Sequence, residues 1–174
     1  YHHDREFERF VKSLENSKMV EVASTTLPQM AIPKIISDSR YQTHLNNFNQ
    51  DIEKRANMAY EFLKNIDGVI VNKTYGAFYT TIVFQDGLLN PKQRLKISNP
   101  KIRKKVDEFS KNVSNDMRFA YELLGATGIC IVPISTFCTE LQGFRMTLLE
   151  QDSNKFQWIL NQIKEKILEY LHSA

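Results

Sequence analysis

The sequence predicts an α+β fold, in which helices cover a small sheet of about three to four strands in a mixed or antiparallel arrangement. Two observations predict it. Long segments carry apolar residues at helical spacing, and short β-branched or aromatic runs between them are bounded by glycine or proline. The predicted order is helix, β-hairpin, helix, strand, strand, helix, preceded by a less regular N-terminal segment.

Length and composition agree with one ordinary domain. The chain has 174 residues, of which 42% are hydrophobic and 25% are charged. This length allows one domain of roughly 100 to 200 residues. The 11 Phe, 7 Tyr and 1 Trp supply bulky side chains for a core, which excludes intrinsic disorder. Only 6 Gly are present, and no glycine-rich phosphate-binding motif occurs.

The first half contains the clearest helix. Apolar spacing predicts a short helix over residues 6–14, an extended piece at 19–23, and a helical face over 30–36 that is interrupted near Pro33. A long connecting helix is predicted over residues 43–66, and Gly68 follows it as a residue suited to the left-handed helix end. Its apolar stripe comprises Leu45, Phe48, Ile52, Ala59, Phe62, Leu63 and Ile66.

The remaining elements follow the same two patterns. Residues 69–71 and 77–84 are predicted to form a hairpin. One helix is predicted over residues 106–124, closed by Gly125, and then a buried strand at 128–133 and another strand at 144–149. Asp152 or Ser153 is expected to cap a last helix.

Charge and hydropathy exclude several classes of partner. The chain has 23 Lys plus Arg against 20 Asp plus Glu, a net charge of +3, which is too small to indicate nucleic acid or an anionic membrane. The basic residues between 92 and 105 lack an interleaved aromatic for base stacking, so we predict a solvated loop there. The longest apolar run, residues 128–134, is far shorter than the ~20 residues of a membrane span.

Cysteine and histidine give no pattern of a metal or hydrolytic site. Cys130 and Cys138 have no second Cys or His at metal-ligand spacing, and so few cysteines fit a reducing, cytoplasmic location. His44 and His172 lie far apart, and no Ser or Cys lies in a nucleophile-elbow setting. We therefore predict no catalytic residue, metal site or hydrolytic triad in this chain.

Arg145 is the candidate ligand-binding residue. In the pattern GFRMT at 143–147, alternation places Phe144 and Met146 on one face of a strand and Arg145 on the other. A guanidinium held by a strand can bind a carboxylate through two parallel hydrogen bonds. From periodicity by itself, a surface or salt-bridged arginine is the favoured interpretation.

Several ordered motifs resemble a known enzyme family. GICIVP at 128–133, Ser-Thr-Phe at 135–137 and GFRMT at 143–147 resemble the C-terminal end of the fold-type-I (class I/II) pyridoxal-phosphate (PLP) aminotransferases, most closely the alanine aminotransferase branch. Upstream, GAFY at 76–79 and FAYELL at 119–124 also resemble family segments. Weaker similarity extends back to residue 7, so the resemblance covers nearly the whole chain.

This resemblance implies a concrete activity for a parent enzyme. The parent would move an amino group between an amino acid and a 2-oxo acid, with PLP as cofactor and Arg145 binding the substrate α-carboxylate. Residues 1–40 would be the tail end of the cofactor-binding domain or a linker, and residues 41–174 the C-terminal small domain. The family resemblance also implies a homodimeric parent.

The chain departs from the family pattern in two ways. Ile134 and Cys138 stand where the family has glycines, so loop geometry is expected to differ there. The Schiff-base lysine, the aspartate for the pyridine nitrogen and the phosphate-binding residues lie upstream of the matched region in the family. Neither Lys18 nor Lys73 has the family's sequence context. We therefore expect no cofactor bound to this chain and no activity from the chain alone.

Two other functions remain open at this point. A non-enzymatic α+β module on the same scaffold could bind a carboxylate ligand or a partner protein. A basic nucleic-acid module built on residues 92–105 would bind DNA or RNA with a steep salt dependence. The amino acid that the parent enzyme would use is not identified by the sequence.

Overall fold

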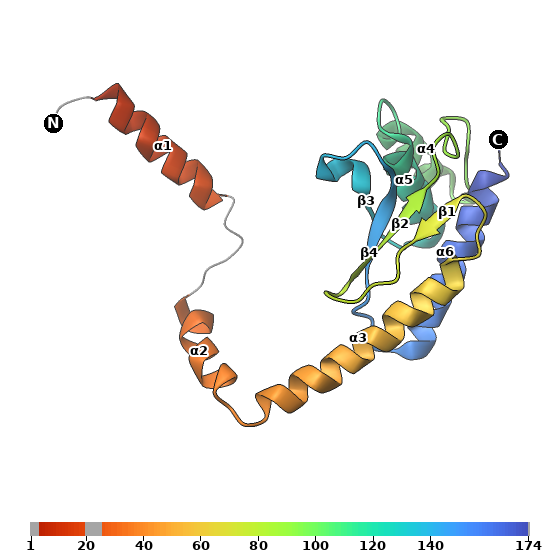
Figure 1. The fold of residues 1–174 in the computed structure, drawn as a ribbon. Coiled ribbons are helices and arrows are strands. Elements are labelled where there is room, and N and C mark those ends of the chain that lie inside the picture. Colours follow the sequence, from red (N-terminus) through yellow and green to blue (C-terminus); the bar gives the residue numbers. More distant parts are fainter. Residues whose placement is uncertain (1–3, 20–25, 174) are drawn as a thin grey trace. The chain divides into compact units, whose positions relative to one another are not determined.

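The computed structural model describes residues 4–19 and 26–173, and the chain divides into two compact units, 1–47 and 48–174 (Figure 1). The first unit contains α1 (Arg5–Met19), α2 (Thr26–Ile36) and the start of α3 (Tyr41–Leu63). The helix predicted over 6–14 is therefore confirmed and is longer than predicted. Met19 is helical, and the rest of the predicted extended piece lies outside the described residues.

Proline does not interrupt the second helix. Pro33 lies inside α2, although its ring nitrogen cannot donate to the preceding turn. The helix continues past it to Ile36, and the carbonyl of Pro33 accepts from the backbone N–H of Ser37 at 3.1 Å. The predicted interruption near Pro33 is therefore wrong.

The long predicted helix is confirmed as α3, which ends at Leu63 rather than at Ile66. After it, a short turn leads to Gly68, whose φ of +77° allows the chain to reverse into the first strand. A Cβ on Gly68 would also lie 2.6 Å from Leu88 Cδ2. This glycine is thus required by both conformation and space.

The second unit is built on a four-stranded sheet with the order β1-β2-β4-β3. Its strands are β1 (Val69–Val71), β2 (Tyr79–Phe84), β3 (Val132–Pro133) and β4 (Gln142–Thr147), and every neighbouring pair is antiparallel. The α+β class is confirmed, as is the pairing of the first two strands. The four-residue 3-10 helix η1 (Ile134–Phe137) connects β3 to the loop before β4.

The buried strand predicted at 128–133 is much shorter than expected. Only Val132 and Pro133 pair with β4, and the side chains of Cys130 and Val132 are exposed. Since β3 is an edge strand, one of its sides lacks a neighbour, and an apolar sequence does not by itself produce burial there.

Two helices replace the single helix predicted over 106–124. They are α4 (Pro100–Phe109) and α5 (Asn115–Thr127), separated at Asn112, whose φ is +56°. Gly125 lies inside α5, where a Cβ would lie 2.6 Å from Val106 Cγ2 of α4. The apolar periodicity therefore continues across two packed helices, and Gly128, with φ +78°, ends α5 instead of Gly125.

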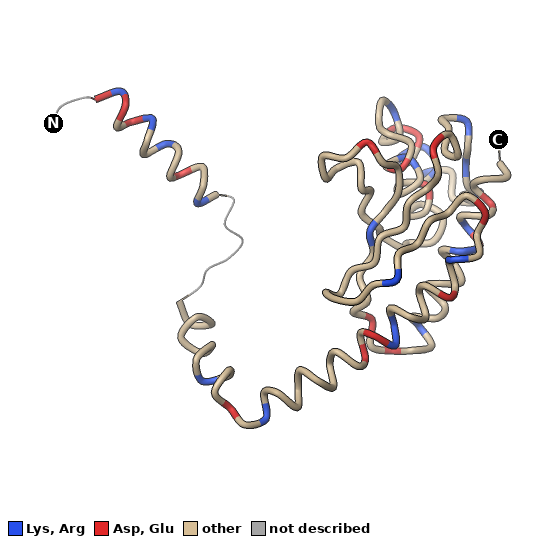
Figure 2. The backbone as a smooth tube through the Cα atoms, in the orientation of Figure 1, with Lys and Arg blue, Asp and Glu red and all other residues tan. Residues whose placement is uncertain are grey.

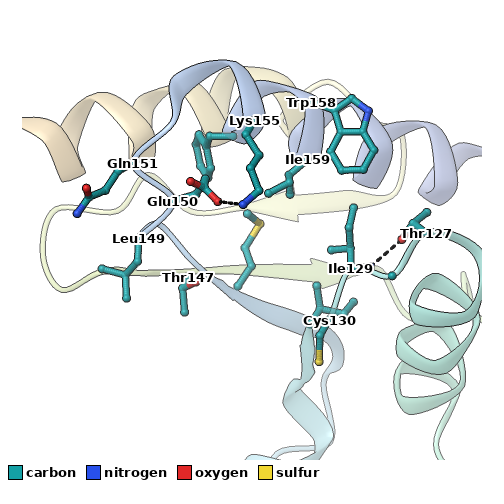
Figure 3. A pocket seen from close by; sticks show the side chains of 14 residues that line it. Thr127, Ile129, Cys130, Thr147, Leu149, Glu150, Gln151, Lys155, Trp158 and Ile159 are labelled. Carbon is teal, nitrogen blue, oxygen red and sulfur yellow. Dashed lines mark hydrogen bonds and ion pairs between the residues drawn. The ribbon is translucent and has the colours of Figure 1, made fainter.

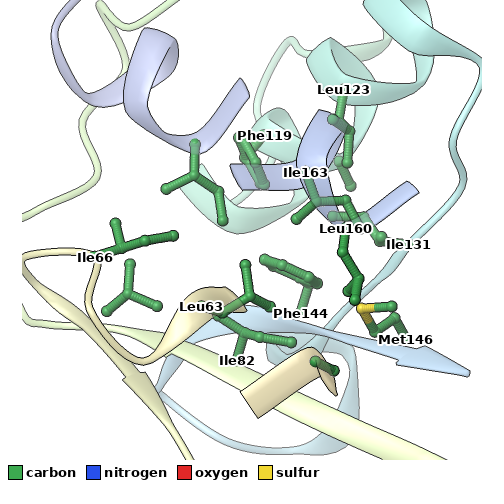
Figure 4. Close-up of a cluster of buried hydrophobic side chains, with 14 of the residues drawn as sticks. Leu63, Ile66, Ile82, Phe119, Leu123, Ile131, Phe144, Met146, Leu160 and Ile163 are labelled. Carbon is green, nitrogen blue, oxygen red and sulfur yellow. The ribbon is translucent and has the colours of Figure 1, made fainter. Parts of the chain in front are cut away.

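The core lies on one face of the sheet, between the strands and the helices (Figure 4). Ile82, Phe144 and Met146 of the strands meet apolar side chains of α3, α5 and α6 (Ser153–Leu171). Asp152 caps α6 as predicted, accepting from the backbone N–H groups of Asn154 and Lys155. The other side chains of β4 must consequently point to the opposite face.

The basic segment is not a simple solvated loop. Residues 100–109 form α4, and Arg103 donates to the buried carboxylate of Glu122 through both Nη atoms, at 2.8 and 2.7 Å. The backbone N–H of Leu95 donates to the same carboxylate at 3.0 Å. Figure 2 marks the basic and acidic positions of the described residues along the backbone. Glu122 therefore attaches the segment to α5.

Candidate functional site

Arg145 lies on the face of the sheet that is opposite the core. Its strand neighbours Phe144 and Met146 are 0% and 7% exposed, whereas Arg145 is half-buried. The residue pairs with Thr81 of β2 on one side and Val132 of β3 on the other. Because strands flank it on both sides, the backbone of Arg145 is held in place by the sheet.

Two aromatic rings enclose the guanidinium group. Arg145 Cζ lies 4.3 Å from the ring centroid of Tyr79 and 4.4 Å from that of Phe137. Tyr79 belongs to β2 and Phe137 to η1, so the site is assembled from three separate elements. The negative faces of both rings attract the cation, and arginine is well suited to such stacking because its guanidinium is flat.

The positive charge of Arg145 has no acidic partner among the described residues. No carboxylate of residues 4–19 and 26–173 forms an ion pair with it, and its Nε atom is buried without a hydrogen-bond partner. A buried cationic donor that lacks a partner is unfavourable by itself and favours the approach of an anion. The salt-bridged alternative from the sequence is thus not the arrangement found.

A buried carboxylate on α5 anchors the loop that carries Phe137. Asp116 is 0% exposed and accepts from Ser135 through its backbone N–H at 3.0 Å and its Oγ at 2.7 Å. It also accepts from Ser114 Oγ at 2.6 Å and from the backbone N–H of Gly143 at 3.4 Å. One carboxylate therefore connects α5, η1 and β4.

These hydrogen bonds determine the ionisation of Asp116. Burial acts to raise the pKa of its carboxyl, but the hydrogen bonds from Ser114, Ser135 and Gly143 to the ionised form outweigh burial and hold the pKa below its ordinary value. The sequence analysis missed Asp116. The available signal was a lone acidic residue in the first turn of a helix, next to Ser114, and this signal is common at helix starts.

The two residues that replace family glycines lie at the ends of η1. Cys138 has φ +56° and ψ +39°, in the left-handed region where a glycine would be unstrained. Ile134 is buried, and its Cδ1 lies 3.0 Å from the position that a Cβ on Gly143 would occupy. Ile134 thus fills space above the strand that carries Arg145, while Cys138 keeps a glycine-like backbone.

The other residues considered from the sequence lie on segments other than β4, the strand that carries Arg145. His172 lies at the end of α6, with Nδ1 2.7 Å from the carbonyl oxygen of Leu168. Lys73 is exposed, with Nζ 5.8 Å from the ring centroid of Tyr75. His44 and Lys18 belong to the first unit and are likewise exposed. Within the described ranges, no cluster of three or more His, Cys, Asp or Glu side chains could hold a metal ion.

A separate groove of about 680 Å³ lies between the end of β4, the start of α6 and residues 127–131 (Figure 3). Lys155 Nζ lies 2.6 Å from Glu150 Oε2 within it, and Trp158 stands at its border. Arg145 is not among the lining residues. In the parts of the chain that the structure describes, no helix has the length and apolar character of a membrane span.

Comparison with known proteins finds aminotransferase relatives. The chain is 49% identical over 168 residues to an uncharacterized aminotransferase of Methanocaldococcus jannaschii, a match that covers 97% of this chain and 39% of that protein. The chain is homologous to aminotransferases. This confirms the resemblance to aminotransferases. The present chain spans 39% of the length of that curated relative, which is less than half.

Other matches of this aminotransferase homologue are weaker. It is 29% identical over 113 residues to a probable mitochondrial alanine aminotransferase of Dictyostelium discoideum, covering 62% of this chain and 18% of that protein. No family model matches.

Two solved structures align with part of the chain. An Escherichia coli aminotransferase aligns with TM-score 0.48 and 18% identity, covering 68% of this chain and 24% of its own. An aspartate aminotransferase of Rhizobium meliloti aligns with TM-score 0.47 and 22% identity, covering 71% and 26%.

Replacing Cys138 by glycine should stabilise the second unit. A non-glycine residue in the left-handed region costs about 1 kcal/mol, and Cys138→Gly removes that cost. Urea unfolding should show the gain. The matched control is Cys130→Gly, at an exposed position without a positive φ, where added chain entropy should give no gain. Equal effects of the two substitutions would contradict a backbone cause.

Asp116→Asn should reduce stability and change its pH dependence. At pH 7 the loss should be about 1–3 kcal/mol, because an amide N–H would face buried donors. The folded pKa of Asp116 lies below the ordinary value of an aspartate carboxyl, so its stabilisation is complete above that ordinary value and disappears as pH falls through the folded pKa. The variant should therefore lose less stability on acidification below about pH 4.

Denaturant titrations across this pH range measure both effects. The control is Asp67→Asn, which changes an exposed carboxylate and should alter stability by less than about 0.5 kcal/mol. Parallel pH profiles for the unchanged chain and Asp116→Asn would argue against an ionised Asp116 as the anchor.

Proposed function

We propose that this chain is the C-terminal part of a PLP-dependent aminotransferase that moves an amino group between an amino acid and a 2-oxo acid. In this proposal Arg145 binds the α-carboxylate of the substrate. The observation that carries it is the unpaired guanidinium of Arg145, held between two rings on a strand with the family motif GFRMT. Residues 41–174 are the small domain, and residues 1–40 are the tail end of the cofactor-binding domain or a linker.

The chemistry of amino transfer explains why such a group is useful. The bond to be broken at the substrate α-carbon must be held in one orientation to react, and a carboxylate gripped by two parallel hydrogen bonds cannot rotate freely. Arginine supplies both donors from one flat group and stays charged at any physiological pH. A lysine at this position would supply a point charge without the same directional control.

The cofactor belongs to another part of the parent enzyme in this proposal. PLP, when bound, withdraws electrons from the substrate α-carbon. The described residues of this chain do not fit it, because Lys18 and Lys73 are both exposed and neither has the sequence context of the family's Schiff-base lysine. The lysine, the aspartate and the phosphate-binding residues are therefore assigned to sequence beyond the matched part, and the chain alone is proposed to be inactive.

The remaining properties of the parent follow the same proposal. We assign it to the cytoplasm, which is supported by Cys130 and Cys138 being free thiols. We assign it a homodimeric state on the family resemblance alone. Its partners are the amino acid and the 2-oxo acid, and neither nucleic acid nor a membrane has a role. The particular amino acid is left open.

Substitution of Arg145 tests the site in the full-length parent. Arg145→Ala should raise KM for amino and oxo acids and lower kcat/KM by about a hundredfold or more, since a bidentate charged contact is lost. Arg145→Lys should recover little of this loss. Arg94→Lys, at a partly exposed arginine that does not touch the site, is the control. Steady-state kinetics that are unchanged for Arg145→Ala would remove it from the substrate site.

Reaction of the isolated chain with PLP tests where the cofactor lysine lies. After incubation with PLP and reduction by borohydride, intact mass measurement should show no stoichiometric adduct, because the proposal assigns the Schiff-base lysine to another part of the parent. The full-length parent treated in parallel should gain one adduct. A stoichiometric, single-lysine adduct on the 174-residue chain would overturn the assignment.

A further inference from the structure

The two rings beside Arg145 are each fixed from a different direction. The ring of Tyr79 lies 4.4 Å, centroid to centroid, from that of Phe78, so the neighbouring aromatic supports it. Phe137 belongs to η1, which Asp116 ties to the sheet through Ser135. The Tyr79 ring therefore has a neighbouring ring beside it, and the backbone that carries Phe137 is anchored to the sheet.

The accessible end of the guanidinium follows from the burial of its other end. Arg145 Nε is buried and has no hydrogen-bond partner, whereas the Nη atoms are not among the buried unpaired atoms of the described residues. Both ring centroids lie close to Cζ, at 4.3 and 4.4 Å. With Nε buried, the Nη atoms are the donors that an anion can reach.

We infer that Tyr79 and Phe137 are positioning residues, which hold the guanidinium of Arg145 in one plane and so orient the bound carboxylate. This inference rests on the proposed function and adds to it the two residues that orient the guanidinium of Arg145 toward the carboxylate. An arginine without an acidic partner has several accessible rotamers, and immobilising it costs free energy at the moment of binding. The two rings restrict the Arg145 side chain already in the unbound protein, so less conformational entropy is lost on binding. The ligand that this arrangement suits is an anion that accepts two hydrogen bonds from the guanidinium, such as a carboxylate.

NMR of the full chain labelled with ¹⁵N-arginine tests the enclosure directly. Protons above the face of an aromatic ring are shielded, so the Nε–Hε signal of Arg145 should lie upfield of those of exposed arginines. Arg145→Lys assigns the signal by removing it. Tyr79→Leu and Phe137→Leu should each move it back downfield, whereas Tyr79→Phe keeps the ring and should leave it in place.

Titration with sodium acetate tests the functional consequence. Acetate should perturb the Arg145 signal, with sodium chloride at equal ionic strength as the screening control. Tyr79→Leu and Phe137→Leu should each weaken the apparent affinity by about tenfold, because the side chain must then be ordered on binding. Tyr79→Phe should bind as the unchanged chain does. Phe109→Leu removes an exposed ring that contacts Tyr121 rather than Arg145, and it should change neither the signal nor the affinity.

The outcomes separate this inference from the proposed function. If the Leu variants bind acetate as the unchanged chain does while Arg145→Lys loses binding, positioning by the rings is overturned and the carboxylate site stands. If the unchanged chain shows a shielded Arg145 signal that acetate does not perturb, the carboxylate site and the positioning role are overturned together. If the Arg145 Nε–Hε signal of the unchanged chain is not shielded, the rings do not enclose the guanidinium and the inference is overturned. This test needs no variant, so it holds even if the Leu variants fail to fold.

Discussion

Antiparallel pairing of β4 with β2 is the constraint on which the site depends. The pairing sets Phe144 opposite Ile82 and Arg145 opposite Thr81, and the core takes the first pair. Since successive side chains alternate between the faces of a strand, burial of Phe144 forces Arg145 to the other face. A shift of one residue in this register would bury the guanidinium and expose the phenyl ring, so core packing itself maintains the position of the candidate site.

The helix layer supports the far side of the sheet through a single carboxylate. Asp116 begins α5, whose apolar residues pack in the core, and its side chain accepts hydrogen bonds from Ser135 and Gly143. Burying an ionised carboxylate costs free energy unless several hydrogen-bond donors contact it. Here the donors belong to η1 and β4. The hydrogen bonds from Ser135 to Asp116 therefore fix the position of η1, the element that carries Phe137.

The residues that replace family glycines affect the two ends of η1 differently. Cys138 keeps the left-handed backbone that glycine would adopt, so the direction of the chain is retained at an energetic cost. Ile134 instead adds volume that packs above Gly143, within the sheet-facing side of the loop. The loop therefore has a left-handed residue at one end and a buried isoleucine at the other.

The sequence by itself determined the fold class, the long helices and the resemblance to aminotransferases. The spacing of apolar residues predicted α3 and α6. Alternation along the strand placed the side chains of Arg145 and Phe144 on opposite faces of the sheet, and the motifs around GFRMT indicated the relationship to aminotransferases. Helical spacing of apolar residues is a local pattern, and here it continues from one helix into the next. It therefore did not reveal the break between them, and α4 and α5 were predicted as a single helix. Likewise, the apolar run at 128–133 indicated burial that an edge strand does not provide.

Only the tertiary structure decided what surrounds the guanidinium. Tyr79 and Phe137 reach Arg145 from β2 and η1, and Asp116 holds η1 from α5. These contacts join residues far apart in the chain, and their geometry follows from strand order and register, which no local pattern encodes. The absence of an acidic partner among the described residues is a property of the same kind, because it depends on where every carboxylate lies once the chain has folded.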